Sequence, residues 1–177
     1  MNSIPRDSLW CAAPVAAGRL RRWLTDPGSL TARLERHAGR ISVRVLFQGL
    51  RRPNPDEAFL FASRSARVMV REVLLLRGAT PLVFAHTVFD PAGLRGAWRG
   101  VAVLGNRPLG AALFADPRIA RFPLHQKKLA ASHPLHRRAA ARLKRPPAAL
   151  WARRSIFAAG KSPILVSEVF LPAVSDL

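Results

Sequence analysis

The sequence predicts an α+β fold built on one antiparallel sheet. Two pairs of apolar segments are each joined by a short turn that contains glycine, the pattern of a β-hairpin: residues 67–76 with 81–89, and residues 155–158 with 164–171. A further segment at residues 41–47 begins with alternating apolar and polar side chains and is predicted as a strand. Hairpins separated by helical segments are typical of α+β domains. The chain of 177 residues is long enough to bury a core as a single domain, residues 1–177.

Two helices are predicted from their end signals. The first covers residues 30–36, with Ser29 as its N-cap and Gly39 beyond its end. The second covers residues 109–115 and follows Pro108, a residue that suits the beginning of a helix.

A basic arm follows the second helix. Residues 118–154 contain eleven Lys and Arg and three of the five histidines, and they contain no acidic residue. Several prolines interrupt the arm, so we expect one or two short helices in a partly mobile insertion at about residues 118–152. Such an arm can bind nucleic acid or phospholipid, or it can be a solvated surface insertion. The solvated insertion is favoured, because single-strand binders generally stack bases on a series of aromatic side chains, and no such interleaved series is present in the arm.

Composition narrows the function classes. The formal net charge of +19 indicates an anionic partner, which can be nucleic acid, a membrane surface or a small acidic substrate. Cys11 is the only cysteine, which excludes a disulfide framework and a thiolate zinc cluster. No metal-ligand pattern, Gly-rich phosphate loop or nucleophilic triad is evident. No apolar run approaches the roughly 20 residues of a membrane-spanning helix, and no basic region precedes the short apolar patch near the N-terminus. We therefore expect a cytoplasmic protein.

Two charged residues stand out because each lies in the middle of an apolar strand. Glu168 shares a strand face with Ile164, Val166 and Phe170, and Arg71 has apolar neighbours in residues 67–76. A buried carboxylate or guanidinium needs a partner of opposite charge. One interpretation is that Arg71 and Glu168 pair with each other, or Arg71 with a nearby acid such as Glu72. The other is that both face a closed pocket, where Arg71 would bind a substrate carboxylate and Glu168 would contact a hydroxyl or ether oxygen.

His86 lies inside the second strand of the first hairpin, on a face with Leu82, Phe84 and Val88. A buried structural histidine is favoured there over a pocket residue.

Six segments, in this order, resemble the chorismate lyase (chorismate–pyruvate lyase) family, and the resemblance as a whole covers about residues 10–173, nearly the whole chain. They are residues 28–31 (GSLT), 70–75 (VREVLL), 81–91, 104–110 (LGNRPLG), 150–155 (LWARRS) and 167–173 (SEVFLPA).

The resemblance implies a six-stranded antiparallel sheet with flanking helices and two helical flaps that close over a buried ligand site. It implies a monomeric enzyme without cofactor or metal, a carbon–oxygen lyase that removes pyruvate from chorismate and leaves 4-hydroxybenzoate. That reaction opens ubiquinone biosynthesis. The expected partner is the small-molecule substrate chorismate, with no nucleic acid and no stable membrane insertion.

Family positions that contact the aromatic ligand fall here on Leu30, Arg71, Leu109 and Glu168. Arg71 and Glu168 are the expected catalytic pair: Arg71 anchors the ring carboxylate, and Glu168 either assists proton removal or orients an intramolecular hydrogen shift. A family arginine is replaced here by His86, and the basic arm is longer than in short family members.

Two other functions remain as alternatives. The same fold resembles the effector-binding domains of GntR-type transcription regulators, which sense a small ligand, although only about 25 residues precede the first matching segment, too few for a winged-helix domain. The third interpretation is a basic nucleic-acid-binding module.

Overall fold

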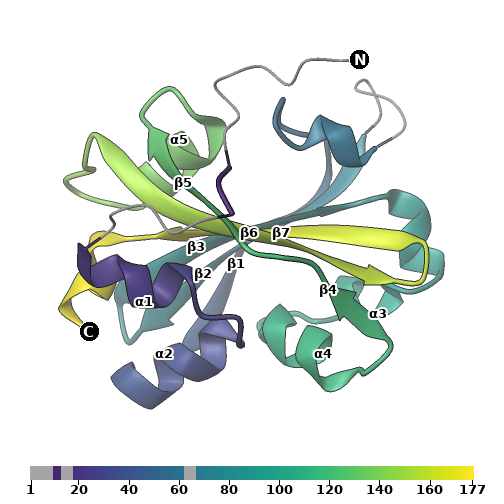
Figure 1. Cartoon of the computed structure of the whole chain (residues 1–177), viewed down its shortest axis with the longest axis horizontal. Coiled ribbons are helices and arrows are strands. Elements are labelled where there is room, and N and C mark those ends of the chain that lie inside the picture. Colours follow the sequence, from purple (N-terminus) through teal and green to yellow (C-terminus); the bar gives the residue numbers. More distant parts are fainter. Residues whose placement is uncertain (1–9, 13–17, 62–66) are drawn as a thin grey trace.

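The computed structural model describes residues 10–12, 18–61 and 67–177, and their centre is a seven-stranded sheet in which every pairing is antiparallel (Figure 1). The strand order is β1-β2-β3-β7-β6-β4, and β5 also pairs with β6. The strands are β1 (Ser42–Arg51), β2 (Val68–Arg77), β3 (Thr80–Phe89), β4 (Ile119–Arg121), β5 (His125–Ala130), β6 (Ala149–Ala159) and β7 (Ser162–Phe170). The predicted α+β class is confirmed. The sheet has a seventh strand because β4 and β5 share the edge beside β6.

Helices cover both faces of this sheet. They are α1 (Arg21–Leu24), α2 (Leu30–Ala38), α3 (Arg99–Ala102), α4 (Leu109–Ala115) and α5 (Pro134–Ala140). Figure 1 shows α1, α2 and α4 on one face and α5 on the other. On the first face Leu34 of α2 packs with Val83 and Phe170, and on the second face Leu135 of α5 packs with Phe84. Both sheet faces are therefore apolar, which explains why the strands carry so few polar residues.

The predicted helices and hairpins are present with small changes in length, except that the strand predicted at 155–158 begins six residues earlier, at Ala149 of β6. The Ser29 hydroxyl accepts a hydrogen bond from the Ala32 amide, as an N-cap does, and α2 ends at Gly39, whose φ of 76° favours glycine. The four hairpin strands are β2, β3, β6 and β7, and β7 lies between β3 and β6, in the interior of the sheet as predicted. Glu168 therefore does project from a central strand.

The basic segment 118–154 differs from its prediction as a helical insertion, and that prediction is wrong. The segment supplies β4, β5 and the first half of β6, and α5 is its only helix among the described residues. In β5 the side chains of Gln126 and Leu129 are buried whereas Lys128 is exposed, and Pro123 falls between the two edge strands. Lysine and proline are typical of sheet edges, where they discourage pairing with other chains. The residues that indicated an insertion are therefore those of an edge.

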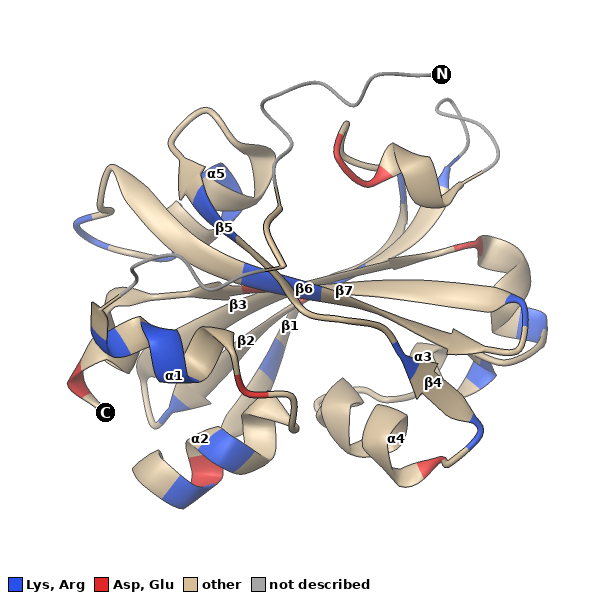
Figure 2. Ribbon diagram, in the orientation of Figure 1, with Lys and Arg blue, Asp and Glu red and all other residues tan. Residues whose placement is uncertain are grey.

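The positive charge is distributed rather than gathered. Figure 2 shows Lys and Arg on α1 and α2 at one face of the sheet and on α5 at the other. In the part of the chain that the structure describes, no helix has the length and apolarity needed to cross a membrane.

His86 lies on the sheet face opposite α2, between two buried glutamates. Its Nδ1 is 3.0 Å from Oε1 of Glu72, its neighbour across β2 and β3, and its Nε2 is 3.2 Å from Oε1 of Glu57. Arg51 and Arg138 also contact Glu72, from β1 and α5 respectively. These contacts agree with the interpretation of His86 as a buried structural residue.

The charges in this cluster stabilise one another. Burial alone would lower the pKa of His86, but Glu57 and Glu72 outweigh it and hold that pKa above the ordinary 6.5. Burial alone would raise the pKa of Glu57 and of Glu72, but His86 and the hydrogen bonds to each carboxylate leave both below the ordinary 4.5. The two carboxylates thus favour the protonated form of the histidine.

We expect His86→Gln to lower the free energy of unfolding by about 3 kcal/mol near pH 6, because removing one partner of a buried ion pair has roughly this effect. The stabilisation from a raised histidine pKa is fully present below the unfolded value of 6.5 and is lost as the pH rises through the folded value. The difference between wild type and variant should therefore shrink above pH 6.5. Urea unfolding over a pH series measures it, and a difference that grows with pH would contradict the cluster's charge assignment.

Candidate active site

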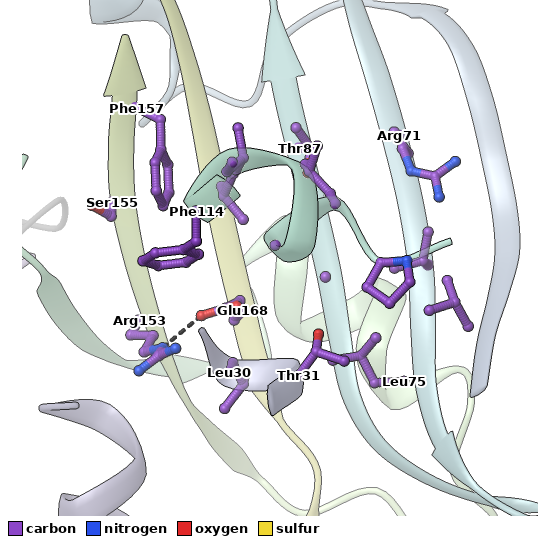
Figure 3. Close-up of a pocket in the computed structure, with 18 of the residues that line it drawn as sticks. Leu30, Thr31, Arg71, Leu75, Thr87, Phe114, Arg153, Ser155, Phe157 and Glu168 are labelled. Carbon is purple, nitrogen blue, oxygen red and sulfur yellow. Dashed lines mark hydrogen bonds and ion pairs between the residues drawn. The ribbon is translucent and has the colours of Figure 1, made fainter. Parts of the chain in front are cut away.

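A pocket lies between the sheet and the first turns of α2 and α4 (Figure 3). Side chains from β2, β3, β6 and β7 form its floor, and Arg121 of β4 adds to one side. The space between the lining residues is about 690 Å³, including the part open to solvent. Most of the lining is apolar, with Val73, Leu75, Phe114 and Phe157 among it. All four predicted ligand contacts, Leu30, Arg71, Leu109 and Glu168, line this one pocket.

Leu30 and Leu109 are the first residues of α2 and α4, so the two helices begin at the pocket. The helices are in close contact there. A Cβ atom on Gly110 would lie 3.2 Å from Oγ of Ser29, closer than side chains usually approach. Glycine at this position therefore lets α4 approach the N-cap of α2, and the two helices together form a cover over the sheet.

Arg71 is buried, with an exposed fraction of 2 %, and it does not pair with Glu168 or Glu72. Its Nη1 donates to Oε1 of Gln48 at 2.8 Å, and its Nη2 donates to the carbonyl of Gly105 at 2.7 Å, in the loop before α4. Burial lowers the pKa of Arg71. The interpretation of an Arg71–Glu168 pair is thus wrong. Within the described residues Arg71 has only neutral acceptors, so its positive charge is not compensated.

Glu168 pairs instead with Arg153, a residue that sequence reasoning missed. The Nε of Arg153 donates to Oε2 of Glu168 at 2.5 Å, and Arg153 has an exposed fraction of only 1 %. Its Nη1 donates to the carbonyls of Trp23 and Asp26, each at 2.8 Å, so the same guanidinium holds the chain between α1 and α2. Figure 3 shows Glu168 turned toward Arg153, with Arg71 on the opposite side of the pocket.

The sequence did contain a signal for Arg153. The hairpin of β6 and β7 turns at Gly160 and Lys161, with Ala159 opposite Ser162. Counting back along both strands from that turn places Arg153 opposite Glu168, which is the observed register.

Arg121 is a second missed arginine. Its guanidinium carbon lies 5.1 Å from the ring centroids of both Phe114 and Phe157, and its Nε donates to Oγ of Ser155 at 3.3 Å. The sequence gives no signal for Arg121, because its short strand β4 lies in the segment that was predicted to be an insertion. The hydroxyl side chains of Thr31, Thr87 and Ser155 also line the pocket.

The electrostatics of the pocket favour an anionic ligand. Its charged lining residues are Arg71, Arg121, Arg153 and Glu168, a formal net charge of +2. Because Glu168 is neutralised by Arg153, the two remaining positive charges belong to Arg71 and Arg121. The described residues contain no cluster of three or more His, Cys, Asp or Glu side chains suited to a metal ion.

A family model described as chorismate lyase matches residues 6–176. The chain belongs to the chorismate lyase family. A relative named "Probable chorismate pyruvate-lyase" from Aromatoleum aromaticum is 48 % identical over 183 residues, covering 100 % of this chain and 99 % of that protein. A relative with the same name from Nitrosomonas europaea is 48 % identical over 170 residues, covering 95 % of this chain and 96 % of that protein. The family is one of lyases, so the chain is an enzyme.

Solved structures show the same fold at much lower identity. The effector domain of PhnF from Mycobacterium smegmatis matches with a TM-score of 0.53 and 13 % identity, over 82 % of this chain and 90 % of that one. The ligand-binding domain of a protein assigned to the GntR family of transcriptional regulators, from Bordetella bronchiseptica, matches with a TM-score of 0.53 and 18 % identity, over 76 % and 86 %. This chain therefore shares its fold with an effector domain and a ligand-binding domain.

Arg153→Met should lower the free energy of unfolding by about 3–5 kcal/mol, because it leaves the Glu168 carboxylate and two backbone carbonyls without their donor. Arg99→Met is the matched control: it makes the same substitution on the exposed side of α3 and should change stability by less than about 0.5 kcal/mol. Urea unfolding of both variants measures the difference. Equal stability of the two variants would contradict the structural role of Arg153.

Proposed function

We propose that this enzyme eliminates pyruvate from chorismate and releases 4-hydroxybenzoate, the first step of ubiquinone biosynthesis, in the cytoplasm and as a monomer. The observation that carries the proposal is the placement of Arg71 and Glu168 on opposite sides of one apolar pocket with a net positive lining. Family membership supports the same reaction. No cofactor is needed, because the step is an elimination without net oxidation or reduction.

Arg71 is placed to anchor the ring carboxylate of chorismate. It is a guanidinium without a carboxylate partner among the described residues, in a pocket where charge-assisted hydrogen bonds are strong. Leu30 and Leu109 cover the ring from the beginnings of α2 and α4. A ring bound at Arg71 extends across the pocket toward Glu168, so its hydroxyl-bearing carbon lies at the Glu168 end.

The reaction breaks the bond between ring carbon 3 and the ether oxygen, and it removes the hydrogen of ring carbon 4. The electron pair of the C4–H bond enters the ring, which becomes aromatic, and the ether oxygen becomes the keto oxygen of pyruvate. Glu168 can serve this step in two ways. As a base it takes the hydrogen as a proton, and the departing enolpyruvate gains a proton from solvent at its methylene carbon. As an orienting group it holds the 4-hydroxyl while the hydrogen moves directly to that methylene carbon.

The cover formed by α2 and α4 also separates the pocket from solvent. It excludes water from the reacting ether, and it encloses the flat aromatic product after pyruvate has left. Release of 4-hydroxybenzoate then requires the cover to open, which would make product release slow.

We expect purified protein to convert chorismate to 4-hydroxybenzoate, followed by its ultraviolet absorbance. Glu168→Gln should lower kcat by at least about 100-fold, since positioned acid–base groups contribute 10²–10⁴-fold.

Arg71→Met should weaken 4-hydroxybenzoate binding by a similar factor through the lost charged hydrogen bond. Tight binding of 4-hydroxybenzoate without turnover by the wild type would favour a sensor instead.

The two roles of Glu168 are separated by chorismate carrying deuterium at ring carbon 4. A direct shift delivers the deuterium to the methyl group of pyruvate, whereas a base loses it to solvent. Mass spectrometry of pyruvate, trapped before its methyl group exchanges, reads the outcome. Full retention excludes Glu168 as the base, and full loss excludes the direct shift.

The surplus surface charge should assist the encounter with a dianionic substrate. We expect kcat/KM to fall as ionic strength rises from about 10 to 500 mM, because the Debye length shortens from about 30 to less than 5 Å. The kcat value should change much less, since the pocket interactions are shielded from solvent. A kcat/KM that does not change with salt would refute this steering.

A further inference from the structure

The pocket contains two guanidinium groups that no described carboxylate neutralises by an ion pair. Arg71 belongs to β2, and Arg121 belongs to β4 at the other side of the sheet, with β3, β7 and β6 between them. The role given above to Arg71 accounts for one of these charges. The anchoring of the ring carboxylate uses only Arg71, and therefore it gives no function to the second positive charge, at Arg121.

Arg121 is held by its neighbours, although one of its buried polar atoms has no hydrogen-bond partner. The rings of Phe114 and Phe157 both lie 5.1 Å from its guanidinium carbon, and one hydrogen bond, from Nε to Oγ of Ser155 at 3.3 Å, fixes its orientation. Its Nη1 is buried and has no hydrogen-bond partner. A buried donor that belongs to a charged group is costly to leave unpaired, so such an atom needs an explanation.

The electrostatic surroundings of Arg121 favour the binding of an anion beside its guanidinium. Burial lowers the pKa of Arg121, and the nearby charge of Arg153 lowers it further, while only Glu168 raises it. Glu168 is already held by Arg153 at 2.5 Å, and therefore it does not supply an ion pair to Arg121. The protein thus maintains a partly desolvated cation beside the Glu168 end of the pocket, a state that an incoming carboxylate would stabilise.

We propose that Arg121 binds the second carboxylate of the substrate, the one carried by the enolpyruvyl group that leaves. The inference rests on the proposed elimination and adds to it a residue for the leaving group. Chorismate has two carboxylates, and the pocket has two guanidiniums free of carboxylate partners. The ether joins the ring beside carbon 4, so an enolpyruvyl group next to Glu168 places its carboxylate on the Arg121 side.

This arrangement gives each product its own anchor. When the C3–O bond breaks, pyruvate keeps its carboxylate on Arg121 while 4-hydroxybenzoate stays on Arg71. Because 4-hydroxybenzoate has only the ring carboxylate, it never uses Arg121. Arg121 is therefore a binding residue for substrate and pyruvate but not for the aromatic product.

The test compares Arg121→Met with Arg71→Met. Arg121→Met should lower kcat/KM for chorismate by about 30- to 1,000-fold, the range for truncating one partner of a buried charge pair. It should leave the Kd of 4-hydroxybenzoate within about twofold of the wild type, whereas Arg71→Met weakens both. Inhibition by added pyruvate should be lost in Arg121→Met, and Arg121→Lys, which keeps the charge, should recover part of the activity.

Two further measurements exclude a merely structural role. Arg121→Met should unfold at an unchanged or higher temperature than the ligand-free wild type, because it removes a half-buried cation that has no carboxylate partner among the described residues. The matched control is Arg118→Met, the same substitution three residues earlier at a side chain that is 87 % exposed, which should leave kcat/KM within about twofold.

The outcomes separate this inference from the proposed reaction. If the wild type forms no 4-hydroxybenzoate, both the reaction and the role of Arg121 are overturned. If the wild type is active but Arg121→Met keeps its kcat/KM, or loses 4-hydroxybenzoate binding to the same extent as chorismate turnover, only the role of Arg121 is overturned. A selective loss of chorismate turnover and of pyruvate inhibition supports it.

Discussion

Arg153 and Glu168 face each other across β6 and β7, and the ion pair between them, at 2.5 Å, determines what the rest of the pocket can do. The pair places the carboxylate at one end of the pocket and gives it a cationic partner in an apolar setting. The same guanidinium binds the carbonyls of Trp23 and Asp26, so it also fixes the chain that leads into α2. Because Arg153 compensates Glu168, the charges of Arg71 and Arg121 stay available to a ligand. One buried pair thus links sheet register, helix placement and pocket charge.

The cover over this pocket depends on a second constraint, the close approach of α2 and α4. Ser29 caps α2 and Gly110 leaves the space for α4 beside it, so both helices can begin at the ligand. Arg71 connects the sheet to this cover through the carbonyl of Gly105. A carboxylate bound at Arg71 would therefore lie at the junction of sheet and cover, where binding and closure can be coupled.

Much of the fold and half of the charged site could be predicted from the sequence. Turn residues and apolar strands revealed the hairpins, and the improbability of an unpaired charge in such strands identified Arg71 and Glu168. The partner of Glu168 follows from the register of the β6–β7 hairpin, which the turn at Gly160 determines. Arg121 could not be found, because β4 is a three-residue edge strand whose pairing depends on contacts distant in sequence.

The net charge of +19 indicated nucleic acid as well as a small acid as the partner. How strongly each positive charge interacts with a ligand depends on where that charge lies. Two unit charges 4 Å apart interact by about 1 kcal/mol in water but by about 4 kcal/mol at an effective dielectric constant near 20. Surface arginines on α1, α2 and α5 lie in water, and their interactions with other charges are screened beyond about 8 Å at physiological salt. Arg71 and Arg121 line the pocket, where the larger energy applies. The two pocket guanidiniums, Arg71 buried and Arg121 half-buried, can therefore select a dicarboxylate, while the many exposed ones act mainly on its rate of arrival.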